Sequence, residues 1–181
     1  MLKSFHLKDL ILISLLATLS IVSKPYVFMA SSFATSSLHM PAGVVGGIWY
    51  MMWISLTYRL VSKRGSVFLF GFLQFFLVMA MLGTPLIKAI TYLPPVLMAE
   101  LIYFFLADAN ILFTDMLVGA VANLTGTILS FLLFYGNQSQ ILLVAGSIAI
   151  VSGSLSAFIS QFLVARLNNV HQLVRTSSER E

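Results

Sequence analysis

Hydrophobic positions along the chain gather into six long stretches, and nearly every charged residue lies between them. The stretches are Leu10–Ser23, Val44–Leu60, Val67–Leu82, Pro85–Leu106, Met116–Tyr135 and Ile141–Val164. Most approach or exceed the roughly 20 residues that an α-helix needs to span the hydrocarbon core of a bilayer. This pattern predicts an all-α integral membrane protein, a compact bundle of six transmembrane helices that forms one domain over residues 1–181.

The composition supports a membrane protein and excludes a soluble domain. Only 9% of the residues are charged, and the mean hydropathy is +0.98, so the chain cannot supply the charged surface that a soluble domain presents to water. The first stretch follows Lys3 and Lys8, as in a signal peptide, but Ser23-Lys24-Pro25 is a poor cleavage site. We therefore interpret this stretch as the first membrane helix.

The positions of the cations predict the orientation in the membrane. With a cytoplasmic N-terminus, most of the Lys and Arg residues fall on the cytoplasmic side, namely Lys3, Lys8, Arg59, Lys63, Arg64, Arg166, Arg175 and Arg180. Only Lys24 and Lys88 then fall outside. Cytoplasmic loops of membrane proteins carry an excess of Lys and Arg. We therefore expect both termini to be cytoplasmic, which agrees with an even number of spans.

The connections between the stretches differ in length. The outer connection over residues 24–43 is long and rich in serine and aromatic residues, and it contains His39. A loop of this length is typical of a lid over a binding site, but an interfacial segment with aromatics at the headgroups has the same composition. Pro94-Pro95 predicts a kink in the fourth helix. The polar residues 168–181 are expected to form a short cytoplasmic tail.

Polar and aromatic residues inside the spans are the candidates for a binding site, because such groups are costly to bury in lipid. Lys88 and Tyr92 are four residues apart on the fourth helix and so share a face. The predicted substrate-binding residues are Trp49, Trp53, Gln74, Lys88, Tyr92, Asn123 and His39. Two alternatives stay open: the tryptophans as interfacial anchors, and Lys88 extended to the membrane surface. Glu100 lies deeper and is expected to have a structural or coupling role.

Small residues mark the helix faces that pack closely. Stripes of small residues follow the fifth helix (Gly119, Ala122, Gly126, Thr127, Ser130) and the sixth (Gly146, Ala149, Gly153, Ala157, Ser160). Such residues let membrane helices approach each other, so we interpret both stripes as packing surfaces. On the first helix, Ser14, Ala17 and Thr18 form a small face on an otherwise bulky helix, which would serve a partner protein as well as a neighbouring helix.

Several kinds of chemistry have no residues to support them. The sequence has no Gly-rich nucleotide-binding loop ending in Lys-Ser/Thr, and it has no His-Glu-x-x-His motif. Cysteine is absent, which excludes disulfides and thiolate metal sites. We therefore expect no enzyme activity, no ATPase site, no metal and no cofactor. The alternatives to a transporter subunit are a stand-alone facilitator and an intramembrane enzyme or assembly factor.

Four short segments carry a resemblance to a known family. They are Leu7-Lys8-Asp9-Leu10, Pro41-Ala42-Gly43 leading to Gly47-Ile48-Trp49, the basic turn Lys63-Arg64-Gly65, and Met98-Ala99-Glu100-Leu101-Ile102. With six helices and a long outer loop after the first, the chain resembles the substrate-binding S component of an energy-coupling factor (ECF) vitamin transporter. Within this family it is similar to the hydroxymethylpyrimidine, or thiamin-precursor, branch.

The resemblance implies a function and a set of partners. An S component of this family captures a vitamin or precursor outside the cell membrane of a prokaryote. It delivers the vitamin together with a transmembrane coupling subunit and two cytoplasmic ATPase subunits. The family docks through an Ala-x-x-x-Ala pattern on the first helix, which Ser14 and Thr18 match here, with Ala17 alongside. The expected ligand is hydroxymethylpyrimidine or thiamin, then pyridoxine or cobalamin, because aromatic residues favour a flat ring.

Overall fold

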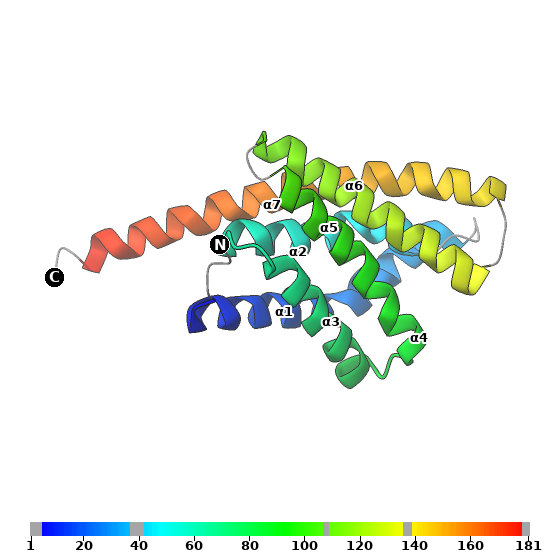
Figure 1. Cartoon of the computed structure of the whole chain (residues 1–181), viewed down its shortest axis with the longest axis horizontal. Helices are drawn as coiled ribbons and strands as arrows, with labels where there is room; N and C mark the ends of the chain where they lie inside the picture. The colour runs from blue at the N-terminus through cyan, green and yellow to red at the C-terminus, as the bar shows by residue number, and fades with distance from the viewer. Residues whose placement is uncertain (1–4, 37–41, 107–108, 136–138, 179–181) are drawn as a thin grey trace.

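The computed structural model describes residues 5–36, 42–106, 109–135 and 139–178, and these residues are helical apart from short turns. The helices are α1 (Leu7–Thr35), α2 (Gly43–Val61), α3 (Ser66–Leu82), α4 (Leu86–Ala89), the 3₁₀ turn η2 (Ile90–Tyr92), α5 (Leu93–Phe105), α6 (Ile111–Ser130), the π-helical turn η3 (Phe131–Tyr135) and α7 (Ser139–Ser178). Figure 1 shows them side by side in one bundle, with the start of α1 and the end of α7 on the same side of the molecule.

The predicted all-helical membrane architecture is confirmed at the level of helices and apolar spans. Within the described residues, five helical segments are long and apolar enough to cross a membrane, and α3 is a shorter apolar helix. The 17 residues of α3 reach about 26 Å at 1.5 Å per residue, slightly less than a hydrocarbon core of about 30 Å. The chain is therefore a multi-pass membrane protein.

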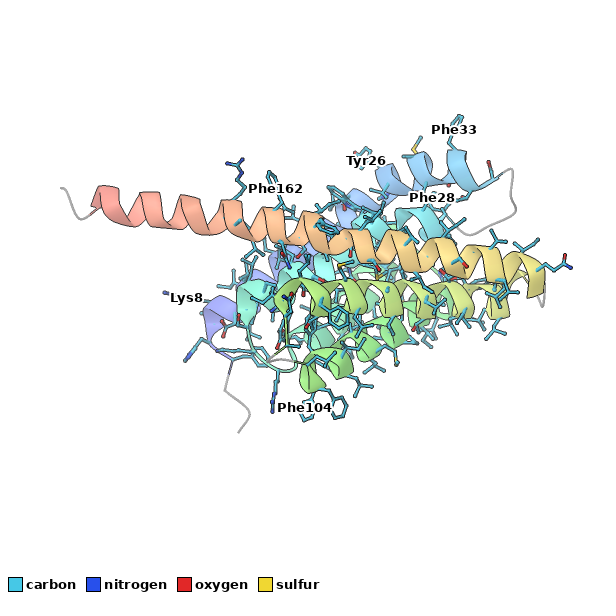
Figure 2. The ribbon with its side chains drawn as sticks, turned by 90° about the horizontal axis from the view of Figure 1, so that it is seen from above. Lys8, Tyr26, Phe28, Phe33, Phe104 and Phe162 are labelled. Carbon is cyan, nitrogen blue, oxygen red and sulfur yellow. The ribbon has the colours of Figure 1, made fainter. Side chains whose placement is uncertain are left out.

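The predicted loop over residues 24–43 is wrong in its first part, because α1 continues through Pro25 to Thr35. Serine and threonine led to the loop prediction, but here their hydroxyls donate to carbonyls one turn earlier, Ser32 to Phe28 and Thr35 to Ser31. Such bonds let these residues stay helical where water is scarce. Figure 2 shows Tyr26 and Phe33 pointing away from the bundle on this part of α1. Residues 37–41, which include His39, lie outside the described residues.

The helix of the fourth apolar stretch changes to a 3₁₀ turn just before Pro94-Pro95, and the kink predicted there stays a prediction. The fourth apolar stretch consists of α4, η2 and α5, and both prolines lie in the first turn of α5. Proline is tolerated there because the first N–H groups of a helix have no partner within the helix. The prolines therefore follow a local 3₁₀ turn within one helical segment that runs from Leu86 to Phe105.

The predicted C-terminal tail over residues 168–181 is helical as far as the structure describes it, because α7 continues to Ser178. No glycine or proline follows Gly153, so nothing in the sequence stops the helix where the apolar stretch ends. Figure 1 shows this end of α7 extending beyond the other helices.

The small-residue stripes of α6 and α7 are confirmed as a packing surface around Gly119 and Gly153, whereas Gly126, Thr127 and Ser130 of the α6 stripe line a cavity. A side chain at Gly119 would overlap the carbonyl oxygen of Gly153, and one at Gly153 would overlap the backbone of Gly119. Ala122 and Ala157 are fully buried near them. The two backbones are therefore in contact, which is the arrangement that small residues permit in membranes.

The predicted docking face on α1 needs one correction. Ser14 and Thr18 are exposed, and the Thr18 hydroxyl donates to the Ser14 carbonyl oxygen at 2.9 Å. Ala17, in contrast, is 0% exposed and packs in the main hydrophobic core beside Ile13 and Leu16. Residue 17 is three positions from residue 14, and the helix turns it toward α2 and α3 rather than toward the outside. Ala17 is therefore a core residue.

Candidate functional site

A cavity of about 580 Å³ lies among the helices at the end of the bundle where Lys24, Tyr50 and Tyr92 meet. We call this end the pocket end. The residues that line the cavity come from α1, α2, α3, η2, α5 and α6 and from the turn after α3. A volume between about 300 and 1,000 Å³ is typical of small-molecule sites. The fold thus brings distant parts of the chain around one space of suitable size.

Four of the predicted binding residues line this cavity, each from a different element: Trp53, Gln74, Tyr92 and Asn123. Tyr92 lies at the end of the 3₁₀ turn η2, directly before α5. Because η2 and the first turn of α5 follow each other, Tyr92 and Pro95 both reach the cavity wall. The prediction of a pocket made from these four side chains therefore agrees with the cavity, while their contact with a ligand stays a prediction.

The two tryptophans of α2 have different roles in the structure. Trp53 lines the cavity and is 9% exposed, and within the described residues its Nε1–H has no hydrogen-bond partner. Trp49 packs against it edge to face, with ring centroids 6.1 Å apart. The Trp49 Nε1–H donates to the Ser23 hydroxyl of α1 at 2.9 Å, and Trp49 is not among the lining residues. Trp49 therefore joins α1 to α2, and Trp53 faces the space between the helices.

Both amides of the cavity wall are held by neighbouring helices. Gln74 is 6% exposed and donates to the Ser20 hydroxyl of α1 at 2.6 Å. Asn123 donates from Nδ2 to the Ala149 carbonyl at 3.0 Å and to the Ser152 hydroxyl at 2.9 Å. A side chain at Gly47 would overlap the Asn123 amide, so glycine is required at this position of α2. Within the described residues, neither Gln74 Oε1 nor Asn123 Oδ1 accepts a hydrogen bond, so each oxygen is able to accept one from a ligand.

Lys24 is the cavity residue that the sequence reasoning missed. It lines the cavity from α1, and its Nζ lies 3.5 Å from the ring centroid of Tyr92 and 5.8 Å from that of Tyr50. A cation within about 6 Å of an aromatic ring is attracted by the electrons of its face. The sequence contained an indication of this role, because Lys24 directly follows the first apolar stretch and a cation so close to a membrane span is costly unless it has a function. The sequence pattern predicts a loop from residue 24 onward, and the continuation of α1 to Thr35 places Lys24 in the bundle instead.

The other predicted lysine lies elsewhere. Lys88 is exposed on α4, its Nζ is 5.7 Å from the ring centroid of Phe134, and it is not among the lining residues. This position fits the alternative in which a lysine extends along the outside of the bundle to the membrane surface. His39 belongs to the residues that the structure does not describe.

The lining of the cavity contains no aspartate or glutamate. Among the described residues, carboxylates occur at the opposite end, where α2 leads into α3 and where α1 and α6 begin. We call this the ion-pair end. Along α1, the 15 positions from Asp9 to Lys24 correspond to about 22 Å of helix. The two ends therefore differ in charge as well as in position.

A buried ion pair dominates the ion-pair end. Asp115 of α6 is 0% exposed and lies 2.8 Å from the Arg59 guanidinium of α2. Arg59 donates to it from both Nε and Nη2, and the Tyr103 hydroxyl of α5 donates to the same carboxylate at 2.8 Å. Tyr58 stacks on Tyr103, with ring centroids 3.8 Å apart. Such a pair needs further hydrogen bonds in the interior, and besides the Tyr103 hydroxyl the Ile111 carbonyl supplies one, accepting from Arg59 Nη2 at 3.1 Å.

The other two described carboxylates at this end bind the turn between α2 and α3. Lys63 pairs with Asp9 of α1. Glu100 of α5 accepts from the backbone N–H groups of Gly65, Val67 and Phe68, at 3.1 Å for Val67 and 3.2 Å for Phe68. A carboxylate at a helix N-terminus satisfies N–H groups that have no partner within the helix. Glu100 therefore has a structural role as the cap of α3, one of the two roles expected for it.

Among the residues described, no group of three His, Cys, Asp or Glu side chains lies together in a way that could hold a metal ion. The cavity lining offers aromatic faces, amide and hydroxyl groups, and an amine.

Comparison with solved structures identifies the architecture. The chain superimposes on a solved structure described as "Crystal structure of an S-component of ECF transporter", with a TM-score of 0.77 and 16% sequence identity. The superposition covers 98% of this chain and 99% of the other. The chain has the fold of an ECF transporter S component. No family model matches the sequence. No curated protein matches it either. The S-component fold is therefore visible in three dimensions while the two sequences differ at most positions.

Proposed function

We propose that this protein is the substrate-binding S component of an ECF-type importer. The observation that supports this most strongly is the S-component fold over nearly the whole chain, together with a cavity at one end of the bundle. The described residues also hold no cluster of catalytic groups in the cavity wall.

The ligand is a small water-soluble micronutrient with a flat ring. Trp53 offers an apolar aromatic edge in the cavity wall, and the rings of Tyr50 and Tyr92 lie near Lys24. Aromatic side chains prefer offset or edge-to-face contact with other rings, so a heterocycle of a vitamin or precursor fits this lining. The amide oxygens of Gln74 and Asn123 supply acceptors that fix the orientation of such a ring.

Energy for transport comes from partner subunits, a transmembrane coupling subunit and two cytoplasmic ATPases. In this proposal the pocket end faces the outside of the cell, both termini are cytoplasmic, and the coupling subunit contacts α1. Ser14 and Thr18 are exposed on α1, whereas Ala17 beneath them is buried. The docking surface therefore consists of Ser14 and Thr18 without Ala17, and small side chains there allow close approach of a second helix.

A docking variant tests the proposal. Thr18→Trp is expected to abolish uptake in cells that express the coupling module and to leave ligand binding by the purified protein unchanged. The control is Leu155→Trp, because Leu155 is an exposed apolar residue of α7 and a large ring there faces lipid; uptake should persist. The measurements are uptake of radiolabelled micronutrient by cells and thermal-shift binding in detergent.

Two results would contradict the proposal. Uptake that does not require the coupling module would favour the stand-alone facilitator. Loss of uptake in both the Thr18 and Leu155 variants, with binding retained, would mean that α1 has no special part in docking.

A further inference from the structure

The cavity contains a lysine amine without an acidic partner. The Lys24 Nζ lies against Tyr92 and near Tyr50, and within the described residues it forms neither an ion pair nor a hydrogen bond. Contact with an aromatic face stabilises an ammonium by about 0.5–2 kcal/mol. This is only part of the hydration free energy that the ammonium loses on burial. An interior charge usually has an opposite charge or several hydrogen bonds beside it. The Lys24 amine therefore lacks a hydrogen-bonding or oppositely charged partner on the side of the cavity.

Among the residues that the structure describes, no acid is free to fill this position. The six acidic residues are Asp9, Glu100, Asp108, Asp115, Glu179 and Glu181. None lies among residues 10–99, and none lies within residues 37–41 or 136–138, whose placement the structure leaves open. Asp9, Glu100 and Asp115 are engaged at the ion-pair end by Lys63, the start of α3 and Arg59. The acids that the structure describes are therefore all engaged at the other end of the bundle, which leaves the charge of Lys24 to be complemented by a bound molecule.

Arg59, a cation in the interior at the other end of the bundle, shows which neighbours a buried positive charge has in this protein. Arg59 lies 5.5 Å from the ring centroid of Tyr58 and 5.7 Å from that of Tyr103, and the carboxylate of Asp115 completes its surroundings. Lys24 likewise has a pair of tyrosine rings beside it, but no carboxylate. It lines the cavity instead.

We infer that the cavity binds a molecule with one anionic oxygen group, a carboxylate, attached to an apolar or aromatic body, and that Lys24 contacts this group. The inference rests on the proposed function and specifies the substrate class of the same site. A singly charged carboxylate matches the one cation among the lining residues. A phosphate dianion would leave one negative charge without a partner in a low-dielectric site, which is costly.

The tyrosines beside Lys24 complete the recognition of the carboxylate. Within the described part of the chain, the hydroxyls of Tyr50 and Tyr92 make no hydrogen bond, so both remain able to donate to an acceptor. A carboxylate has room for several donors on its two oxygens. A cationic ligand such as thiamin would instead bring a second positive charge next to Lys24 and find no acid in the lining. The charge of the cavity thus opposes the thiamin expected from the sequence resemblance.

Matched acid and amide pairs test the inference on the intact protein. Binding is measured by calorimetry on the full chain in detergent or nanodiscs. The probes are nicotinate and nicotinamide, biotin and biotinamide, lipoate and lipoamide, with pyridoxine and its phosphate ester as the phosphate arm and thiamin as the cation arm. At least one acid should bind, at least about tenfold more tightly than its amide, which corresponds to 1.4 kcal/mol. The phosphate ester should show no comparable advantage over pyridoxine.

Variants assign the preference to Lys24. Lys24→Met should reduce the acid-to-amide ratio to about one, whereas Lys24→Arg should retain the preference because the charge remains. Lys88→Met is the matched control, because Lys88 lies on α4, just before η2, but does not line the cavity. The acid-to-amide affinity ratio of this variant should equal that of the unmodified protein. The ratio in the unmodified protein decides the ligand class even if Lys24→Met does not fold.

The inference is overturned if amides or thiamin bind as tightly as the acids, if no acid binds, or if the preference persists in a folded Lys24→Met protein. A larger advantage for the phosphate ester than for any acid would also overturn the choice of a carboxylate. Failure of the proposed function has a different signature. Carboxylate binding that depends on Lys24, without assembly with a coupling subunit, would contradict the S-component role and leave the anion site intact.

Discussion

The two ends of the bundle use the same type of cation site in different ways. At the ion-pair end, Arg59 lies beside two tyrosines and is closed by Asp115, which is 0% exposed. At the pocket end, Lys24 lies beside two tyrosines and faces a cavity without an acid. The first arrangement is complete within the chain. The second needs a group from elsewhere.

This difference separates stability from binding. A charge pair that is complete within the fold holds α2 and α6 together, and removing one partner leaves the other charge buried alone. An incomplete site costs stability in the free protein, but a ligand can recover this cost on binding. Unsatisfied groups of this kind are therefore expected at functional sites rather than in the packed core.

The largest effect is expected from Asp115→Asn at the ion-pair end. The change leaves the Arg59 guanidinium in the interior without a negative partner, which should lower the free energy of unfolding by about 3–5 kcal/mol. Thermal unfolding in detergent, followed by circular dichroism, measures the loss. The control is Asp9→Asn, whose carboxylate is partly exposed and should matter less. Equal losses in the two variants would show that burial of the Arg59 pair has no special importance.

A matched pair of tyrosines sharpens the comparison. Tyr103→Phe removes a hydrogen bond to a buried carboxylate and should lower the free energy of unfolding by about 1.5–3 kcal/mol. Tyr92→Phe removes a hydroxyl that has no hydrogen bond within the described residues, so stability should stay unchanged while affinity for a carboxylate probe decreases. Unfolding and calorimetry on both variants separate the two roles. A stability loss in Tyr92→Phe larger than in Tyr103→Phe would break the comparison.

A smaller effect is expected when the chain itself supplies the missing carboxylate. Phe28 lines the cavity four residues after Lys24 on α1, so Phe28→Glu places a carboxylate on the same face as the amine. This internal partner should compete with an anionic ligand and weaken binding of the best acid roughly tenfold, or about 1.4 kcal/mol. Phe28→Gln is the control of matched size. Calorimetry that shows the same loss in both variants would attribute it to the lost ring, and the charge argument would fail.

The sequence by itself determined the class of protein and most of its helices. Long apolar stretches with few charges leave a helix in a bilayer as the only way to satisfy the backbone, so the spans followed from composition and length. The same cost of burying polar groups selected Trp53, Gln74, Tyr92 and Asn123, which line one cavity. Small residues on α6 and α7 also indicated their contact, because close approach requires the absence of side chains.

Where the helices ended depended on bonds that the residue types do not reveal. After Pro25, the hydroxyls of Ser32 and Thr35 bind carbonyls of the same helix, and the continuous helix includes Lys24. The same side chains in a different setting would form a turn. Local sequence therefore allowed both a loop and a helix.

The tertiary structure alone decided which charges are paired and which are left open. Arg59 and Asp115 are 56 positions apart, and Lys24 and Tyr92 come from different helices, so no local pattern relates them. Ala17 illustrates the same limit, because only the packing of α1 on its neighbours shows that it belongs to the core and not to the docking face. Pairing depends on distances between helices, and those distances are fixed by packing across the whole bundle. The open amine at the cavity is a property of that packing.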